Sequence, residues 1–406
     1  MIPKIEKAVF VLFLILLTHQ VSSQSQWNQF RGSDRSGIAG ETIDIQEWNG
    51  ENLELVWKFE LGSGFSELIF DNGIIYTMIS ETIDSITGSE LVAAFDEKTG
   101  RLLWKSRVDS IYFDEDSWGD GSRATPTYDD KNIYSLSGHG KLSATSKKDG
   151  KLVWQVDFKK DFGSTTPRWG FASSPLLVDN TLIMEVGGTD SRAFAGFNPE
   201  NGSLKWSSGN GNASHDSPLF AIIEGKQQII FANGNTLYSY NSQGDTLWTF
   251  KMPISRLTAM PLQIDENKIF LSGVRNPGFF VVEIKNNKPE QILTGNTMKN
   301  DFSSCVYHEG YIYGFNVAAV RCISAETGEA KWTKRGYGKG ALMMVDGKLI
   351  VISDKGKVII IEGTPDAYKE LASVQAIKGK SWTAPSFNNG KIFVRNLTEM
   401  ACYRLK

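Results

Sequence analysis

Short apolar runs, each closed by a turn signal, repeat along most of the 406-residue chain. Five stretches share one pattern, in which a turn glycine is followed four residues later by tryptophan. Glycine can adopt the positive φ that closes a hairpin without steric cost. The tryptophan then falls on the outgoing strand, where we expect its ring to pack against a neighbouring unit. These stretches are Asp96–Trp104, Ser146–Trp154, Asn198–Trp206, Asn241–Trp248 and Ala325–Trp332.

A second motif combines small residues and a proline with two short strands joined by a turn. Its marker prolines are 49, 43, 43 and 124 residues apart. The last interval equals three units of about 41 residues, and the degenerate copies Ser303–Asn316 and Ala341–Ser353 fill it. A period near 43 residues with four strands per unit is typical of a β-propeller blade. The clear copies are Arg123–Ser137, Ala172–Val186, Asp216–Ala232, Ala259–Gly273 and Thr383–Asn396, with prolines Pro126, Pro175, Pro218, Pro261 and Pro385.

Closure of the ring sets the number of blades. The last unit, Trp382–Leu405, has three strands, and an unmatched tryptophan strand, Asn52–Leu61, precedes the first unit. Pairing the two would remove two open sheet edges. We therefore predict an all-β, eight-bladed β-propeller of the quinoprotein-like type, closed by its N- and C-terminal strands. The seven complete units end near Val108, Val156, Ser208, Phe250, Leu293, Lys334 and Val374, and the predicted blade-docking tryptophans are Trp57, Trp104, Trp154, Trp206, Trp248 and Trp332. In the fifth and seventh units Ile292 and Leu371 replace the tryptophan, so we expect less regular contacts there.

The N-terminus has the pattern of a cleavable export signal. Lys4 and Lys7 precede the apolar run Ala8–Leu17, and Ser23 is an acceptable residue before the cut. That run is about half of the length needed to cross a bilayer. We predict a signal peptide at residues 1–23, an N-terminal extension at 24–51 and the propeller at 52–406, in a periplasmic or secreted protein. No cysteine lies near the predicted cleavage site, so we do not predict a lipid attachment site.

The net charge and the cysteine content indicate which classes of partner are not expected. The net charge of −3 gives no reason to expect nucleic acid, and no later segment is apolar enough to span a membrane. The three cysteines, Cys305, Cys322 and Cys402, lie in apolar strand-like runs, where we expect small buried thiols rather than metal ligands. We expect a monomer whose partner is an unknown protein or a small-molecule ligand.

The repeated Ser/Thr-Pro strand and the turn D-x-x-T-G-x-x-x-W together resemble the repeats of pyrroloquinoline quinone (PQQ) type propellers over almost all of Asn52–Lys406. One branch of that group contains the quinoprotein alcohol dehydrogenases, which use PQQ and calcium. Another is non-catalytic and includes BamB, the lipoprotein of the outer-membrane β-barrel assembly machinery. Trp27–Gly40 resembles the start of secreted PQQ-repeat proteins without assigned activity, and could either cap the propeller axis or run across the outside.

The resemblance also allows the enzyme interpretation to be tested. A quinoprotein dehydrogenase needs a tryptophan floor, carboxylates and an amide on calcium, an Asp base and an adjacent Cys pair. This chain has no adjacent Cys pair, and no Glu-Asn-Asp calcium set maps onto it. We therefore predict an exported, non-catalytic binding or scaffold module of the cell envelope without a cofactor. The alternatives are a PQQ- and calcium-dependent alcohol or sugar dehydrogenase and a partner in outer-membrane protein assembly.

Residues just before the first strand of each unit should meet at the mouth of the propeller axis. Cations beside tryptophan rings could hold an anionic or sugar-like ligand there. We do not expect Ser214, His215 and Asp216 to form a catalytic relay, because neighbours along a strand point to opposite faces. The acidic insertion Asp114–Gly121 lacks the spacing of a calcium-binding EF-hand loop and is expected to be a solvated loop. The predicted mouth residues are Glu67, Arg123, Arg168, Trp169, His215, Arg256, Asp301, Lys339 and Trp382, with no catalytic and no metal-ligating residue among them.

Overall fold

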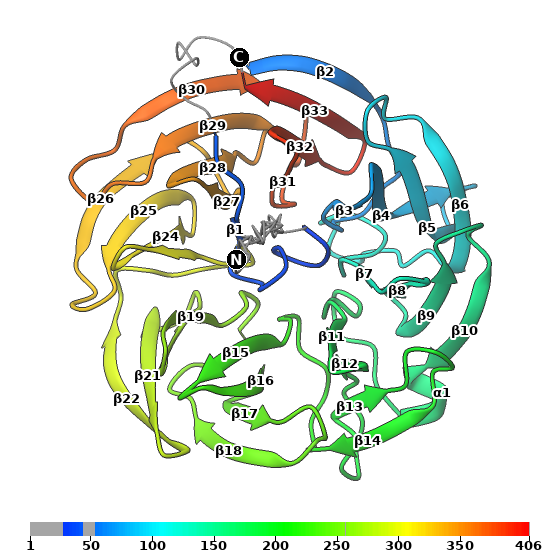
Figure 1. Ribbon diagram of the computed structural model, residues 1–406, viewed down its shortest axis with the longest axis horizontal. Helices are drawn as coiled ribbons and strands as arrows, with labels where there is room; N and C mark the ends of the chain where they lie inside the picture. Colours follow the sequence, from blue (N-terminus) through cyan, green and yellow to red (C-terminus); the bar gives the residue numbers. More distant parts are fainter. Residues whose placement is uncertain (1–26, 44–52, 256, 406) are drawn as a thin grey trace, which may run out of the picture.

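The described residues form a closed ring of eight blades, each a four-stranded antiparallel sheet, and one blade gains a fifth, parallel strand (Figure 1). The computed structural model describes residues 27–43, 53–255 and 257–405. The expected export signal and Arg256 lie outside these residues. Within each blade the first strand lies near the axis and the fourth at the outside (Figure 1). The predicted eight-bladed propeller is confirmed.

The blades follow one another in chain order. The first holds β3 (Ile69–Asp71), β4 (Ile74–Thr82), β5 (Gly88–Asp96) and β6 (Leu102–Ser110), and the second β7 (Thr127–Tyr128), β8 (Asn132–Leu136), β9 (Lys141–Ser146) and β10 (Leu152–Asp157). After the short helix α1 (Phe158–Phe162), the third holds β11 (Leu176–Val178), β12 (Thr181–Glu185), β13 (Phe194–Phe197) and β14 (Leu204–Ser208). The fourth holds β15 (Leu219–Ile223), β16 (Lys226–Asn233), β17 (Thr236–Tyr240) and β18 (Thr246–Lys251).

The remaining blades keep the same order. The fifth holds β19 (Leu262–Asp265), β20 (Lys268–Ser272), β21 (Phe279–Lys285) and β22 (Lys288–Gly295). The sixth holds β23 (Val306–His308), β24 (Tyr311–Asn316), β25 (Ala319–Ser324) and β26 (Ala330–Arg335). The seventh holds β27 (Ala341–Val345), β28 (Lys348–Ile352), β29 (Lys357–Glu362) and β30 (Glu370–Gln375), and the eighth holds β31 (Ser386–Asn388), β32 (Lys391–Arg395), β33 (Glu399–Leu405) and β2 (Leu53–Glu60).

The eighth blade closes the ring with strands from opposite ends of the sequence. β2 runs antiparallel to β33, with Trp57 opposite Cys402 and Leu55 opposite Tyr403, as predicted (Figure 1). The fully buried Arg395 of β32 links this closing blade to its neighbour in the ring. Its guanidinium donates to the carbonyl oxygens of Met78 at 2.7 Å and of Gly62 and Gly64 at 3.0 Å, so it joins the eighth blade to the first.

The repeated turn glycines pack against the preceding blade. Gly150 has φ of +71°, and a Cβ added there would lie 2.7 Å from the Trp104 ring. The same relation holds for the three pairs Gly100 with Trp57, Gly202 with Trp154 and Gly244 with Trp206. Glycine is therefore required at these turns both by the left-handed backbone and by the tryptophan that covers it.

The second half of the ring departs from this pattern. Gly328 faces Phe279 instead of a tryptophan, because Ile292 replaces the tryptophan of the fifth blade. The Trp248 Nε1–H donates to Gln228 within its own blade at 2.8 Å. Trp332 again reaches the next blade, where its Nε1–H donates to the Thr364 carbonyl at 2.8 Å.

Residues 27–43 pass through the centre of the ring (Figure 1). The strand β1 (Ile38–Ala39) pairs in parallel with β27, and the Phe70 N–H donates to the Trp27 carbonyl at 2.8 Å. The fully buried Arg35 donates to the Pro218 carbonyl at 2.8 Å and also contacts the Pro175 carbonyl. Of the two courses that the sequence left open, this segment takes the axial one.

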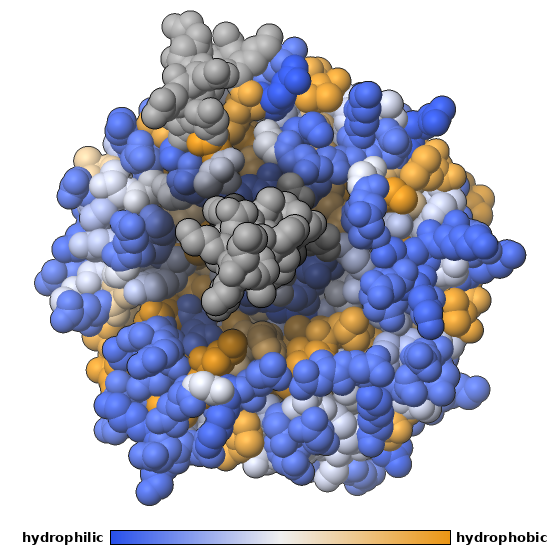
Figure 2. All heavy atoms as spheres, in the orientation of Figure 1, coloured by the Kyte–Doolittle hydropathy of each residue, from blue (hydrophilic) through white to orange (hydrophobic). Residues whose placement is uncertain are grey.

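The three cysteines are buried and unpaired, as expected. Figure 2 shows hydrophilic side chains over most of the blade ends on the face seen in Figure 1. Within the described ranges, no helix is long and apolar enough to cross a membrane.

Candidate functional site: the axial pocket

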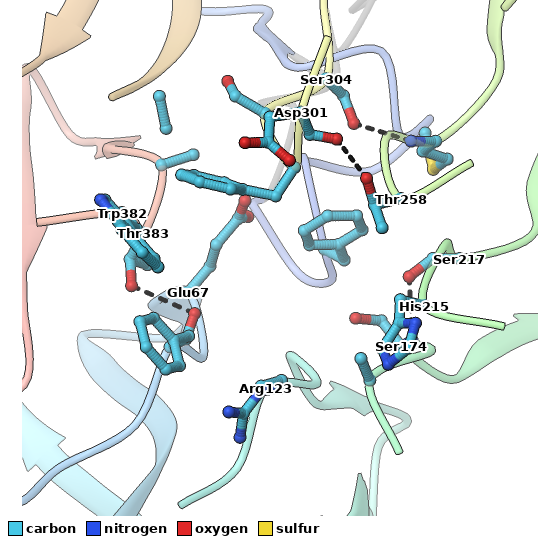
Figure 3. Close-up of a pocket in the computed structure, with 18 of the residues that line it drawn as sticks. Glu67, Arg123, Ser174, His215, Ser217, Thr258, Asp301, Ser304, Trp382 and Thr383 are labelled. Atoms are coloured by element: carbon cyan, nitrogen blue, oxygen red, sulfur yellow. Dashed lines mark hydrogen bonds between the residues drawn. The ribbon is translucent and has the colours of Figure 1, made fainter. Parts of the chain in front are cut away.

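A pocket of about 340 Å³ lies on the axis, beside the residues that precede the innermost strands (Figure 3). In Figure 3 the blades follow one another in the opposite sense to Figure 1, so the pocket is seen from the other face of the ring. Phe30 and Arg31 of the axial segment contribute to its lining. We call the part lined by Phe30, Arg31 and Glu67 the floor, and the part around Trp118, Lys339 and Trp382 the rim.

Seven of the nine predicted mouth residues line this one pocket: Glu67, Arg123, Trp169, His215, Asp301, Lys339 and Trp382. Arg168 lies outside the lining, with 73% of its side chain exposed, and its Nη2 is 2.9 Å from Asp116. The side chains of Arg168 and Trp169 both donate to Asp116, but only Trp169 is among the residues that line the pocket. Arg256 is outside the described residues.

The floor is a buried charge network. The Glu67 carboxylate accepts the backbone N–H of Arg31 at 2.9 Å, and both residues are at most 3% exposed. Burial raises the pKa of Glu67 to about 7 from its ordinary 4.5, against the opposing effect of the Arg31 N–H and charge. The Arg31 guanidinium donates to the carbonyl oxygens of Ser36 at 3.0 Å and of Cys305. Arg31 thereby ties the axial segment to the sixth blade.

A belt of hydroxyl groups joins neighbouring blades just above the floor. In each link, the side-chain oxygen of one blade accepts the backbone N–H of the equivalent residue in the preceding blade. Three of these hydroxyls belong to the residue before a marker proline, which gives the Ser/Thr-Pro motif a structural purpose. The links run from Glu67 to Thr125 (2.9 Å), from Thr125 to Ser174 (3.0 Å), from Ser174 to Ser217 (2.9 Å) and from Met260 to Ser304 (2.9 Å). Figure 3 labels Ser174, Ser217 and Ser304 of this belt.

Aromatic rings form one wall of the pocket. The Trp382 ring centroid lies 4.8 Å from that of Phe302, 5.5 Å from that of Trp118 and 6.1 Å from that of Phe65. The Lys380 ammonium lies 4.9 Å from the Trp382 centroid. This wall can pack against an apolar or planar ligand surface, with cations at its edge.

The acidic insertion is not a simply solvated loop. The Asp114 side chain is 1% exposed and lies 3.4 Å from Arg123, whose guanidinium also donates to the Gly121 carbonyl at 2.9 Å. Asp116 accepts the Trp169 Nε1–H at 2.6 Å, and its hydrogen bonds from Arg168 and Trp169 lower its pKa. The solvated-loop expectation is therefore wrong for Asp114, because these carboxylates hold the pocket's cation and tryptophan in place.

His215 points into the pocket, and the hydrogen bonds of its chain neighbours Ser214 and Asp216 do not involve its ring (Figure 3). Burial, and then the charge of Arg123, lower its pKa to about 4, so the ring is neutral at pH 7. The Ser214 hydroxyl instead contacts Asp216, and it lies 2.6 Å from the Glu185 carboxylate. Residues 214–216 lie in an irregular segment and not on a strand, so the strand geometry assumed for them in the sequence analysis is wrong, and the Ser214 hydroxyl bonds to these two carboxylates. The buried pair Glu185 and Asp216 has raised pKa values, because burial penalises both charges.

Comparison with known proteins agrees with this architecture. Residues 88–332 match the profile of the PQQ-repeat family described as outer membrane protein assembly factor BamB. The chain belongs to this family. Over 178 residues it is 28% identical to an uncharacterized protein of Rickettsia conorii, a region that is 42% of this chain and 37% of that protein. Over 173 residues it is 27% identical to the dehydrogenase subunit of the quinone alcohol dehydrogenase of Gluconacetobacter polyoxogenes, covering 40% of this chain and 22% of that subunit. The matched regions thus span well under half of these curated relatives.

Solved structures of the PQQ-repeat family share the fold. BamB from Moraxella catarrhalis superposes with a TM-score of 0.63 at 14% identity, covering 87% of this chain and 98% of BamB. The quinohemoprotein alcohol dehydrogenase of Pseudomonas putida superposes with a TM-score of 0.66 at 13% identity, covering 94% of this chain and 80% of the enzyme.

The pocket residues do not fit the PQQ and calcium set that the family resemblance implies. The pocket's carboxylates are Glu67, which accepts a backbone N–H, and Asp301, which lies 2.5 Å from the Lys339 ammonium. Calcium requires six to eight oxygen ligands. Across the part of the chain that the structure describes, no three His, Cys, Asp or Glu side chains form a metal-binding group. The cysteine in contact with this floor, Cys305, is unpaired.

Sequence reasoning missed Arg31, Phe302 and the serines that line the pocket. Arg31 lies in the Trp27–Gly40 segment that the sequence singled out, but its partners are carbonyl groups far along the chain. The serines belong to the recognised Ser/Thr-Pro motif. That motif could have indicated the belt, since the same residue type recurs at one position in several blades.

Proposed function

We propose that this protein is an exported, non-catalytic propeller that binds a ligand in its axial pocket and serves as a binding or scaffold module of the cell envelope. The observation that carries the proposal is the pocket itself. It has an aromatic wall, a polar floor sealed by Arg31, and side chains from several blades converging on one space. Such a combination of apolar walls and few directed polar groups is typical of ligand sites.

A ligand panel followed by thermal unfolding tests this proposal. A ligand that binds the folded state raises the melting temperature by mass action. The matched variants are Ala172→Trp, which fills the pocket lining, and Ala330→Trp, which adds the same ring on the exposed side of β26. We expect the ligand-induced shift to disappear in Ala172→Trp and to persist in Ala330→Trp. A shift that persists in both variants would place the binding site elsewhere and contradict the proposal.

A quinoprotein oxidoreductase is the second candidate, supported by the similarity to quinone-dependent alcohol dehydrogenases. Titration with PQQ and calcium, followed by assay of alcohol and sugar oxidation with an artificial electron acceptor, separates it from the first. Turnover that depends on both additions would replace the binding-module proposal.

The family profile also supports a third candidate, a partner in outer-membrane protein assembly. It requires specific co-purification with outer-membrane proteins from the native host. Such co-purification surviving in Ala172→Trp would assign that role to a surface other than the pocket.

A further inference from the structure

We propose that the pocket floor binds a monocarboxylate group with Arg31 as its anchor, and that the apolar body of the same ligand packs against the aromatic wall. This inference rests on the proposed ligand-binding function. It adds the chemical class of the ligand, its orientation and the residue that selects it.

The floor and the nearby Arg35 of the axial segment together carry more buried positive than negative charge. Arg31 and Arg35 are 3% and 0% exposed, and Glu67 is the buried carboxyl that faces both. In the described part of the chain neither guanidinium lies within 4 Å of a carboxylate oxygen, and exposed Asp34 adds a weaker attraction to Arg31. Buried charges in proteins are normally paired. A ligand anion at the floor would supply the missing charge.

Arg31 also has an unused hydrogen-bond donor. Arg31 is among the residues that line the pocket, and its buried Nε–H has no partner among the described residues. Its Nη groups donate to the carbonyls of Ser36 and Cys305, which fix the guanidinium plane. A planar carboxylate that reaches this guanidinium from the pocket would meet a donor whose direction is already fixed.

The hydroxyl belt adds further donors around the same space. Ser174, Ser217 and Ser304 line the pocket, and each side-chain oxygen accepts a backbone N–H. Each hydroxyl hydrogen is therefore available to donate, since serine has one donor beside its acceptor lone pairs. A donor-rich floor favours a ligand group that only accepts hydrogen bonds, as an ionised carboxylate does.

Two features favour a single carboxylate over a dianion such as phosphate. Arg31 and Arg35 exceed the buried Glu67 carboxyl by one charge, so one carboxylate would complete the balance and a dianion would exceed it. The wall formed by Phe65, Phe302 and Trp382 offers apolar surface to the remainder of the ligand. The pocket volume of about 340 Å³ suits a small molecule or the last residues of a peptide.

Calorimetric titration with 3-phenylpropanoate and with 3-phenylpropanamide tests the inference, because the two probes differ chiefly in charge. We expect the acid to bind the wild-type protein about tenfold or more tightly than the amide, as a charge-assisted hydrogen bond predicts. Arg31→Gln should remove this preference. Arg335→Gln, on the exposed side of β26, should retain it. Short peptides with free and amidated C-termini then distinguish a peptide terminus from a free acid as the source.

The possible failures are distinguishable. Equal affinity of the wild type for acid and amide would overturn the carboxylate inference and leave the binding function standing. An unchanged preference in folded Arg31→Gln would overturn the role of Arg31. If Arg31→Gln does not fold, Arg31→Lys keeps the charge without the fork and should weaken the preference, and full retention would contradict the proposal. Absence of binding by every probe, including the ligand panel above, would overturn both proposals.

Discussion

The floor and the rim of the axial pocket are built in different ways. Arg31 at the floor and Arg35 in the same axial segment are almost fully buried, and their hydrogen bonds reach backbone carbonyls of separate blades. At the rim and beside it, the ion pairs involve partly or largely exposed side chains, such as Lys339 with Asp301 at the rim and Arg168 with Asp116 beside it. Removing the partner of a buried polar group lowers the free energy of unfolding far more than breaking an exposed ion pair does. The floor therefore contributes to the stability of the ring, whereas the rim can vary with the ligand at little structural cost.

The largest expected effect is at Arg35. Arg35→Met leaves the Pro218 and Ser174 carbonyls without their donor, so we expect a loss of about 2–4 kcal/mol of unfolding free energy. Arg168→Met, on the exposed surface beside the rim, should leave the melting temperature unchanged. Chemical and thermal unfolding of both variants measures the contrast. Equal melting temperatures for the two variants would show that the floor does not stabilise the ring.

The pH dependence of stability should reveal Glu67. Because burial raises its pKa to about 7, the folded state retains a proton that the unfolded chain releases near pH 4.5. Stability should therefore fall as pH rises from about 4.5 to 7, by up to about 3 kcal/mol, and this contribution should be constant above pH 7. Glu67→Gln should remove it from the profile, while Glu185 and Asp216 continue to titrate. A difference profile that is flat between pH 4.5 and 7 would contradict this assignment.

The belt should give an intermediate effect. Ser174→Ala removes the acceptor of the buried Thr125 N–H, for an expected loss of about 1–3 kcal/mol. Ser110→Ala, on the exposed outer strand β6, is the matched control and should change stability by less than about 0.5 kcal/mol. Hydrogen exchange at the Thr125 amide adds a local measurement. Unchanged protection of that amide in Ser174→Ala would show that the bond contributes nothing.

The smallest effect on stability is expected at the rim. Asp116→Asn weakens the contacts to Arg168 and Trp169, both near the pocket mouth. We expect an unchanged melting temperature with faster ligand association and dissociation, measured by stopped-flow tryptophan fluorescence. A large fall in melting temperature would mean that the rim is as structural as the floor.

The sequence was sufficient for the ring because its signals are local and repeated. The glycine turns, marker prolines and tryptophans recur at one spacing, and the unpaired strand around Trp57 required a partner. The residues before each innermost strand also reach the mouth by the same geometry in every blade, which explains why seven of nine predicted residues line the pocket.

The floor could not be predicted in this way. Arg31 and Arg35 donate hydrogen bonds to backbone carbonyl groups. Every residue has such a group, so no pattern of side chains in the sequence identifies the partners. The departure at Gly328 has a similar origin, since Phe279 reaches the position of the missing tryptophan from a different strand. Such substitutions depend on packing in three dimensions and leave no periodic trace.

The seam between β2 and β33 has a consequence for the order of assembly. While the chain is being made, seven blades can form by contacts between neighbours in sequence, but the eighth must wait for residues 399–405. Until then β2 has an unpaired edge, which invites pairing with other chains. Slow synthesis of the last segment would thus prolong the period in which the nascent protein is prone to aggregation.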